Sequence, residues 1–374
     1  MVEYAKYELK NVCSRLSSGK SISSKMISEE GRYPVYGGNG LRGYTDHSNF
    51  SGDCAIIGRQ GAFCGNVRYF CGEAYMTEHA VIVCANNLNN THYLAYLLST
   101  MNLGRLSGQS AQPGLSVKTL GIQEIMLPSI EYQNKVVALL SSLDEKIAVN
   151  NNINDNLQQQ AQSYFQELFV DNADPEWTTG TICDLGAVVG GSTPSKAKPE
   201  YYTESGIAWI TPKDLSINKS KFVSHGENDI TELGLKNSSA AIMPEGTVLF
   251  SSRAPIGYIA IAAGEVTTNQ GFKSVVPKPE IGTPFVYFFL KNTLPVIEGM
   301  ASGSTFKEVS GSTMKNVPAV IPDAETLAKF SDFCAPIFAQ QRILEEQNQS
   351  LATLRDNLLP KLMSGEIDVS AVQL

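Results

Sequence analysis

The chain contains no run approaching the roughly 18 apolar residues that a membrane-spanning helix needs. Its amino terminus, MVEYAKYELK, lacks the basic segment followed by an apolar stretch that defines a secretory leader. From these two absences we expect a cytoplasmic protein that does not engage a membrane.

Signatures of metal, redox and catalytic chemistry are missing as well. The seven cysteines form no Cys-x-x-Cys pair and the four histidines are scattered, which is typical of structural thiols. No two prolines are adjacent, so the Asn-Pro-Pro-aromatic and Asp-Pro-Pro-aromatic runs of amino-methyltransferases are absent, and no convincing G-x-G-x-x-G follows a strand. Lys20 in SSGKS resembles the end of a phosphate loop, but Ser14 stands where that loop needs glycine. We expect no catalysis, cofactor or metal in this chain.

Positive charge is scarce, and a net charge of −8 does not suit a general nucleic-acid binder. The acidity is confined to two segments, since residues 129–176 carry −6 and residues 323–374 carry −4. Residues 1–128 carry +2 and residues 177–322 carry 0. These two segments therefore remain compatible with DNA contact.

The second half of the chain repeats the first. AIIGRQGAFCGNV around Arg59 resembles VLFSSRAPIGYIA around Arg253, an offset of 194 residues. IMLPSIEYQNK and AVIPDAETLAK close the two halves at the same offset, and YELKNVC and WTTGTIC open them. The first half is shorter by about 24 residues in its middle. Ordered matches of this kind indicate two diverged copies of one domain.

An apolar heptad pattern follows each copy and predicts a long helix that needs a helical partner. We expect the two helices to pack antiparallel, with the asparagines fixing their register. The seam positions are Leu140, Leu143, Ile147, Asn150, Asn154, Leu157, Tyr164 and Leu168 in the first helix, and Ile337, Leu344, Asn348, Leu351, Leu358 and Leu362 in the second.

The expected fold class is therefore α+β, with a pseudo-twofold internal repeat. Two globular mixed α/β domains are separated by two long antiparallel coiled-coil helices. The expected boundaries are residues 1–129 for the first domain, 130–172 for the first helix, 173–322 for the second domain, and 323–374 for the second helix and tail.

This order of domains and helices, together with GGSTPSK…GIAWITPKDL, YPVYGGNGLRGY and the ending LRDNLLPKLMSGEIDV, resembles type I restriction-modification specificity subunits over essentially the whole chain. The resemblance implies a non-catalytic subunit with two target recognition domains, each reading one half of a split site in double-stranded DNA, and two spacer helices that set the gap. It implies two methyltransferase subunits as partners and, in the full complex, a restriction/translocase subunit. S-adenosylmethionine, ATP and Mg would then be bound only by those partners.

Candidate DNA-contacting residues are polar side chains in glycine- or proline-marked turns, where a backbone approaches DNA closely. In the first domain they are Lys20, Arg42, Arg59, Gln60, Asn66, Arg68, Thr77, Glu78, His79, Gln109 and Ser110. In the second they are Thr193, Ser195, Lys196, Thr211, Lys213, Ser252, Arg253, Asn269, Gln270, Thr305 and Lys307.

The 194-residue offset makes Arg59 and Arg253 equivalent, and residues shared by both domains cannot easily read different bases. We therefore predict that these two arginines bind phosphates or support the scaffold. Gln60 against Ala254, and Glu78 and His79 against Asn269 and Gln270, are the better candidates for sequence discrimination.

Two other function classes remain open at this stage. One is an assembly scaffold whose helices dock partners and whose domains do not read DNA. The other is a stand-alone DNA-modifying enzyme, against which the missing motifs argue. Sequence-independent binding by the purified complex would favour the scaffold.

Overall fold

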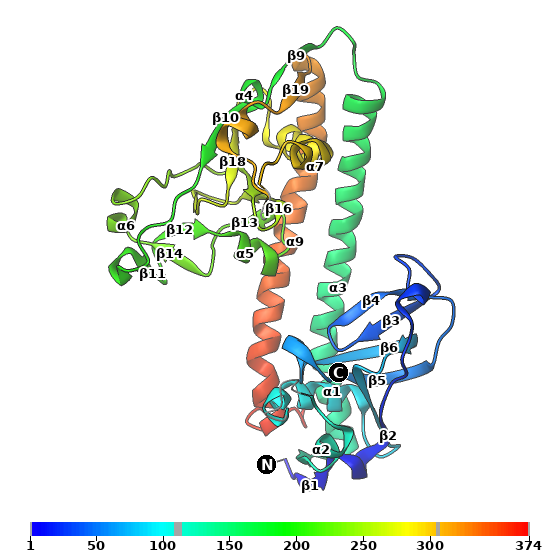
Figure 1. Cartoon of the computed structure of the whole chain (residues 1–374). Coiled ribbons are helices and arrows are strands. Elements are labelled where there is room, and N and C mark those ends of the chain that lie inside the picture. The colour runs from blue at the N-terminus through cyan, green and yellow to red at the C-terminus, as the bar shows by residue number, and fades with distance from the viewer. Residues whose placement is uncertain (1, 108–113, 304–306, 373–374) are drawn as a thin grey trace. The chain divides into compact units, whose positions relative to one another are not determined.

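The computed structural model describes residues 2–107, 114–303 and 307–372, which form two compact units. Unit 1 comprises residues 1–147 and 349–374, and unit 2 comprises residues 148–348. Both units contain a sheet domain and a stretch of the same two long helices, α3 (Ile130–Gln166) and α9 (Ala324–Ser364) (Figure 1). None of the described helices is long and apolar enough to cross a membrane.

Unit 1 is built on a six-stranded sheet against which α1 (Thr91–Ser99) packs. The strand order is β2 (Cys13–Ser18), β7 (Ala80–Ala85), β5 (Phe50–Gly58), β6 (Val67–Met76), β3 (Tyr33–Gly37), β4 (Gly40–Thr45), and only the β3–β6 pair is parallel. A second sheet pairs β1 (Ala5–Glu8) with β8 (Glu124–Leu127). The short helical segments are η1 (Leu9–Val12), η2 (Ser24–Met26), η3 (Gly61–Phe63), η4 (Leu103–Leu106) and α2 (Val117–Gly121).

Unit 2 repeats this plan with additional strands. Its five-stranded sheet runs β10 (Gly186–Gly190), β18 (Lys273–Pro277), β15 (Val248–Ser252), β16 (Ile256–Ala262), β13 (Phe222–Val223), and its four-stranded sheet runs β11 (Tyr202–Thr203), β14 (Asn228–Ile230), β12 (Ile207–Ile210), β17 (Thr267–Thr268). A third sheet pairs β9 (Thr178–Thr181) with β19 (Pro318–Ile321). The helical segments are η5 (Glu167–Asp171), α4 (Ile182–Leu185), η6 (Pro199–Tyr201), α5 (Pro212–Ile217), α6 (Glu232–Lys236), α7 (Thr283–Gly299) and α8 (Gly311–Lys315).

The predicted duplication is confirmed by the order of these elements. β1, β2, β5, β7, α1, α2, β8 and α3 correspond in order to β9, β10, β15, β18, α7, α8, β19 and α9. The parallel β3–β6 pair has its counterpart in the parallel β12–β17 pair. The extra residues of the second copy form β11, β13, β14, α5 and α6, which lie in the middle of the domain as the sequence predicts.

The two long helices pack side by side in antiparallel orientation in each unit. In unit 1, the Arg355 guanidinium donates to Asp144 at 2.7 Å. In unit 2, the rings of Phe165 and Phe330 lie with centroids 5.8 Å apart. As the residue number increases along α3, the number of the contacting residue in α9 decreases. The antiparallel prediction is therefore confirmed.

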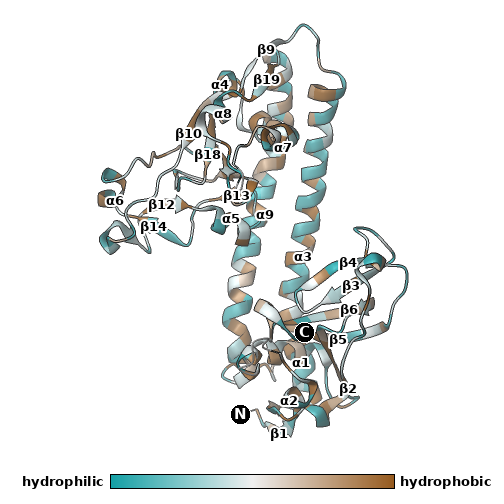
Figure 2. Cartoon of the chain, viewed as in Figure 1, coloured by the Kyte–Doolittle hydropathy of each residue, from teal (hydrophilic) through white to brown (hydrophobic). Residues whose placement is uncertain are grey.

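The predicted seam faces the interior. Leu140, Asn150 and Leu362 are fully buried, Ile337 and Leu344 are nearly so, and Leu143, Ile147, Asn154, Leu157, Tyr164, Leu168, Asn348, Leu351 and Leu358 are half-buried. The two helices are mostly hydrophilic, whereas α7 is strongly hydrophobic (Figure 2). α7 is buried against α9 in unit 2, where Phe288 packs on Phe330 and Phe338. The long helices thus carry a narrow apolar stripe, consistent with coiled-coil packing.

Candidate nucleic-acid interface

A polar cleft of about 700 Å³ opens in unit 2 between turns that come from five parts of its sequence. It brings together seven of the predicted DNA-contacting residues: Thr193, Lys196, Thr211, Lys213, Arg253, Asn269 and Gln270. The remaining lining residues are Tyr202, Trp209, Pro212, Asp214, Glu227, Asn228, Ala254 and Gly271. Long-range strand pairing creates this cluster, because β12 and β17 run parallel and end side by side.

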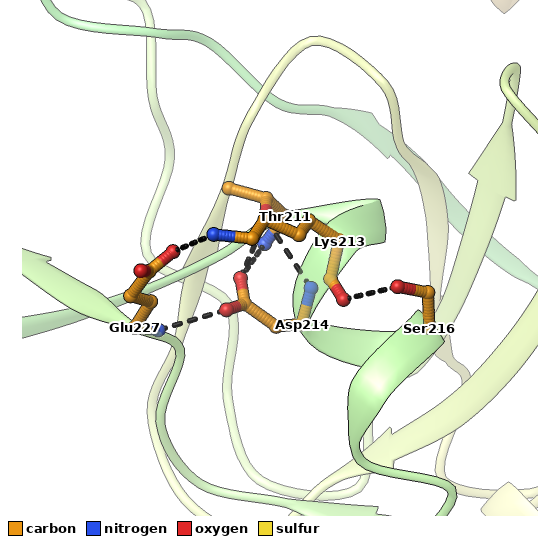
Figure 3. Close-up of polar contacts among 5 residues, drawn as sticks. All are labelled: Thr211, Lys213, Asp214, Ser216 and Glu227. Atoms are coloured by element: carbon orange, nitrogen blue, oxygen red, sulfur yellow. Dashed lines mark hydrogen bonds and ion pairs between the residues drawn. The ribbon is translucent and has the colours of Figure 1, made fainter. Parts of the chain in front are cut away.

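One wall of the cleft is the first turn of α5. Thr211 caps this helix through a capping box, with its N–H and Oγ1 donating to Asp214 Oδ2 at 2.7 and 2.6 Å (Figure 3). The other carboxylate oxygen of Asp214 accepts from the Glu227 N–H at 2.8 Å. The carboxylate of Asp214 is therefore used inside the protein and ties two turns of the cleft together.

Lys213 projects from the same turn and pairs with Glu227 at 2.5 Å (Figure 3). The hydrogen bond to Glu227 raises the pKa of this lysine. The two side chains are 62% and 61% exposed, so this surface pair leaves the ammonium accessible to solvent.

The turn that follows β17 also lines the cleft. The Asn269 side chain accepts from the Gly271 N–H at 2.8 Å, and Gln270 accepts from the Thr193 hydroxyl. Lys273 donates to the Gln270 carbonyl at 3.2 Å. Burial lowers the pKa of Lys273. These bonds hold the turn in shape while the Gln270 side chain remains exposed.

Arg253 also lines the cleft and directly follows β15. Its Nη1 lies 3.4 Å from Glu308 Oε2, and the two side chains are 37% and 40% exposed. The pair is long and partly solvated, so the guanidinium is oriented without being sequestered.

In unit 1 the predicted residues gather around the GGNG turn between β3 and β4. A Cβ on Gly38 would lie 2.9 Å from the His79 carbonyl oxygen and 3.4 Å from the Arg59 nitrogen. On Gly37 it would lie 2.8 Å from the Arg42 side chain. Close approach of the His79 and Arg59 backbones therefore favours glycine at position 38, whereas the neighbour of Gly37 is a flexible side chain.

The surroundings of four more predicted residues of unit 1 are defined: Arg68, Asn66, Glu78 and Lys20. Arg68 reaches the Asn39 carbonyl at 3.4 Å, and with Asn66 it also lines a separate depression of about 450 Å³. Glu78 lies 3.4 Å from His79 Nε2. Lys20 is exposed.

Two predicted contacts are wrong, because the side chains are buried. Thr77 and Ser252 are both 0% exposed. Ser252 donates to the Gly271 carbonyl at 3.1 Å, so its hydroxyl supports the turn instead of facing solvent. Period-2 alternation does not predict this, because both residues lie where a strand ends and the chain turns.

The other predicted residues either lie away from the cleft or fall outside the residues that the structure describes. Ser195 and Lys307 are exposed but do not line the cleft. Gln109, Ser110 and Thr305 lie outside the described residues.

Sequence reasoning missed four residues that shape the cleft: Tyr202, Trp209, Asp214 and Glu227. Trp209 and Asp214 belong to the GIAWITPKDL run and could have been included on that signal. Trp209 is 6% exposed and donates from Nε1 to the Ser192 carbonyl at 3.0 Å. Glu227 stands in a loop that carries no comparable sequence signal. Within the described residues, no cluster of three or more His, Cys, Asp or Glu side chains could hold a metal ion.

Comparison with known proteins agrees with this architecture. A family model described as the type I restriction modification DNA specificity domain matches residues 1–159 and 175–354. The chain is 39% identical over 194 residues to the type I restriction enzyme MjaIX specificity subunit of Methanocaldococcus jannaschii, an alignment that covers 50% of this chain and 45% of that protein. It is 40% identical over 134 residues to the EcoprrI specificity subunit of Escherichia coli, covering 35% of this chain and 33% of that protein.

A longer alignment joins the chain to the HindI specificity subunit of Haemophilus influenzae, with 22% identity over 330 residues, 68% of this chain and 71% of that protein. The crystal structure of a type I restriction-modification S subunit from M. genitalium has the same fold, with a TM-score of 0.63, 18% identity and coverage of 96% of both chains. Because the family model matches both halves of the sequence, the chain belongs to the type I restriction-modification DNA specificity family.

Proposed function

We propose that this chain is the DNA-reading subunit of a type I restriction-modification complex and that it recognises a split target. The observation that carries the proposal is the convergence of seven polar residues, predicted separately from five turns, on one cleft of unit 2. The cleft offers three basic side chains, Lys196, Lys213 and Arg253, next to amide side chains that pair with base edges.

The two domains play the same part with different side chains. Unit 1 presents Gln60 and Glu78, where unit 2 presents Arg253 and Gln270. Two readers with one scaffold and unlike polar residues suit two unlike half-sites. We assign residues 1–129 and 173–322 to the recognition domains and residues 130–172 and 323–374 to the spacer helices and tail.

Hydrogen bonds between α3 and α9 fix the register in which the two helices pack. Asn150 is fully buried in unit 2 and donates from Nδ2 to Asn348 Oδ1 at 2.9 Å. Gln341 donates to the Asn154 carbonyl at 3.0 Å. Buried amide pairs of this kind favour one register of a helix pair, because any slip leaves them unpaired. A fixed register gives a spacer of fixed length.

No step of methylation or cleavage is assigned to this chain. Two methyltransferase subunits, and a restriction/translocase subunit in the full complex, would carry the S-adenosylmethionine, ATP and Mg chemistry. The double-stranded target and these subunits are the partners we propose.

The test is binding of the complex of this chain with its methyltransferase to a library of duplexes that carry randomised bases. We expect enrichment of two short unlike elements separated by a constant gap. Sequence-independent affinity would refute the proposal and would favour the assembly scaffold. Deleting one heptad, residues 151–157, together with its counterpart 341–347, should shorten the gap, and an unchanged gap would refute the spacer role.

A further inference from the structure

The two sheet domains share a pattern of backbone hydrogen bonds around their polar turns. This pattern shows which residue of one domain is equivalent to which residue of the other. Five bonds of unit 1 each have a counterpart in unit 2. The bond from Lys20 N to Met76 O matches that from Ser192 N to Thr268 O, and the bond from Thr77 N to Tyr36 O matches that from Asn269 N to Ile210 O. The bond from Ala80 N to Thr77 O matches that from Phe272 N to Asn269 O, and the bond from Arg59 N to His79 O matches that from Ser252 N to Gly271 O. The bond from Leu115 N to Arg59 O matches that from Val309 N to Ser252 O.

Isolated bridges extend the correspondence by one residue. Gln60 bridges to Gly114 in unit 1, and Arg253 bridges to Glu308 in unit 2. The sequence-based offset of 194 is therefore wrong at this turn. Gln60 occupies the position of Arg253, and Arg59 occupies the position of Ser252.

The side chains at the inner of these two positions serve the scaffold in both domains. Arg59 Nε donates to the Leu115 carbonyl at 3.2 Å. Ser252 is fully buried against the Gly271 carbonyl. The scaffold role predicted for Arg59 has this support, but it does not extend to Arg253.

The side chains at the outer position face solvent in both domains and differ in chemistry. Gln60 is exposed, and the Arg253 side chain is 37% exposed at the edge of the 700 Å³ cleft. Arginine forms two hydrogen bonds with O6 and N7 of guanine, and glutamine forms two with N6 and N7 of adenine. One scaffold position thus carries two side chains that prefer different bases.

We propose that Gln60 and Arg253 are matched specificity-determining residues, with Arg253 reading a guanine in one half-site and Gln60 reading an adenine at the corresponding place in the other. This inference rests on the proposed function. Glu308, which pairs with Arg253, has Gly114 as its counterpart in unit 1. We assign Glu308 the positioning of the guanidinium, which the shorter glutamine does not need.

The test uses the complex of the full chain with its methyltransferase, and the randomised duplex library as probe. Arg253→Lys keeps the positive charge but loses the bidentate hydrogen-bond donor of the guanidinium. Arg253→Gln replaces the arginine with the side chain that stands at the equivalent position of unit 1. We expect Arg253→Lys to reduce guanine discrimination at one position of one half-site by roughly 5- to 150-fold. Arg253→Gln should shift that position towards adenine. Gln60→Arg should shift one position of the other half-site from adenine towards guanine.

Lys213→Gln is the matched control, because it removes a cleft cation that we assign to phosphate contact. It should weaken binding to all duplexes about equally and leave both base preferences unchanged.

The inference is overturned if the wild-type complex selects a split site and the Arg253 and Gln60 variants retain the same preferences at every position. It is also overturned if either variant changes bases in both half-sites. A wild-type complex that selects no sequence refutes the proposed function itself, so the two failures are distinguishable.

Discussion

Lys221 is an unusual residue on which to test the packing of unit 2, because a lysine ammonium is buried there among aromatic rings. The residue is 7% exposed, its Nζ donates to Gln341 Oε1 at 2.5 Å, and the ammonium lies 4.2 Å from the centroid of the Phe338 ring. Burial lowers the pKa of Lys221 from 10.5 to about 7. We predict that Lys221→Met stabilises unit 2 at neutral pH and removes part of its pH dependence.

The magnitude follows from the two pKa values. The difference between 10.5 and about 7 corresponds to about 5 kcal/mol against folding when the lysine is charged. Because the folded-state pKa lies below the unfolded one, this penalty is fully present below pH 7 and is relieved as the pH rises towards 10.5. Between pH 6.5 and 9, the free energy of unfolding of the wild type should rise by about 2 kcal/mol relative to that of Lys221→Met.

Other titratable groups surround this lysine. Lys291, Glu345 and Cys334 interact with it electrostatically, and its ammonium lies 5.0 Å from the Tyr287 ring. These groups are present in both proteins, so comparison of wild type with variant isolates the contribution of Lys221. Contact with the aromatic rings favours the charged form and opposes the effect of burial, but the lowered pKa shows that burial dominates, so Lys221→Met should stabilise unit 2 at pH 7.

The assay is urea unfolding followed by tryptophan fluorescence at pH 6.5, 8 and 9. Both tryptophans of the chain, Trp177 and Trp209, belong to unit 2, so the signal reports that unit. A wild type and variant whose free energies of unfolding change in parallel over this pH range would refute the argument. Lys221→Gln, which retains a hydrogen-bond donor, is the control for loss of the Gln341 contact.

Three further predictions concern contacts inside a single unit. Asp144→Ala should destabilise unit 1 by about 2 kcal/mol, because Tyr96 Oη loses its acceptor and Arg355 keeps only Asp356, and faster amide hydrogen exchange in α1 would show it. Phe330→Ala, at a fully buried ring in α9, should cost unit 2 about 3–5 kcal/mol in the same fluorescence assay, and a cost below about 1 kcal/mol would contradict the packing described. Gly191→Ala should abolish selection at the second half-site, since its Cβ would lie 2.0 Å from the Asn269 carbonyl oxygen, whereas Gly264→Ala meets nothing within 4 Å and should be neutral.

The sequence by itself determined the duplication, the two long helices and their antiparallel pairing. These features depend on local periodicity and on the order of motifs, and both survive divergence because an apolar stripe must be buried wherever the helix lies. It also predicted seven of the fifteen residues that line the cleft of unit 2, since polar residues in glycine- and proline-marked turns mark the places where strands end.

Only the tertiary structure decided which residues are equivalent and which are exposed. Thr77 and Ser252 are polar residues beside the predicted turns, yet both are buried, because their environment is set by strands that pair across long sequence separations. The match of Gln60 with Arg253 likewise depends on hydrogen bonds between distant segments, and loops of different length shift a sequence alignment by one or more residues there. Lys221 shows the same limit, since its partners Gln341 and Phe338 stand on α9, more than 110 residues away, and no local pattern records that contact.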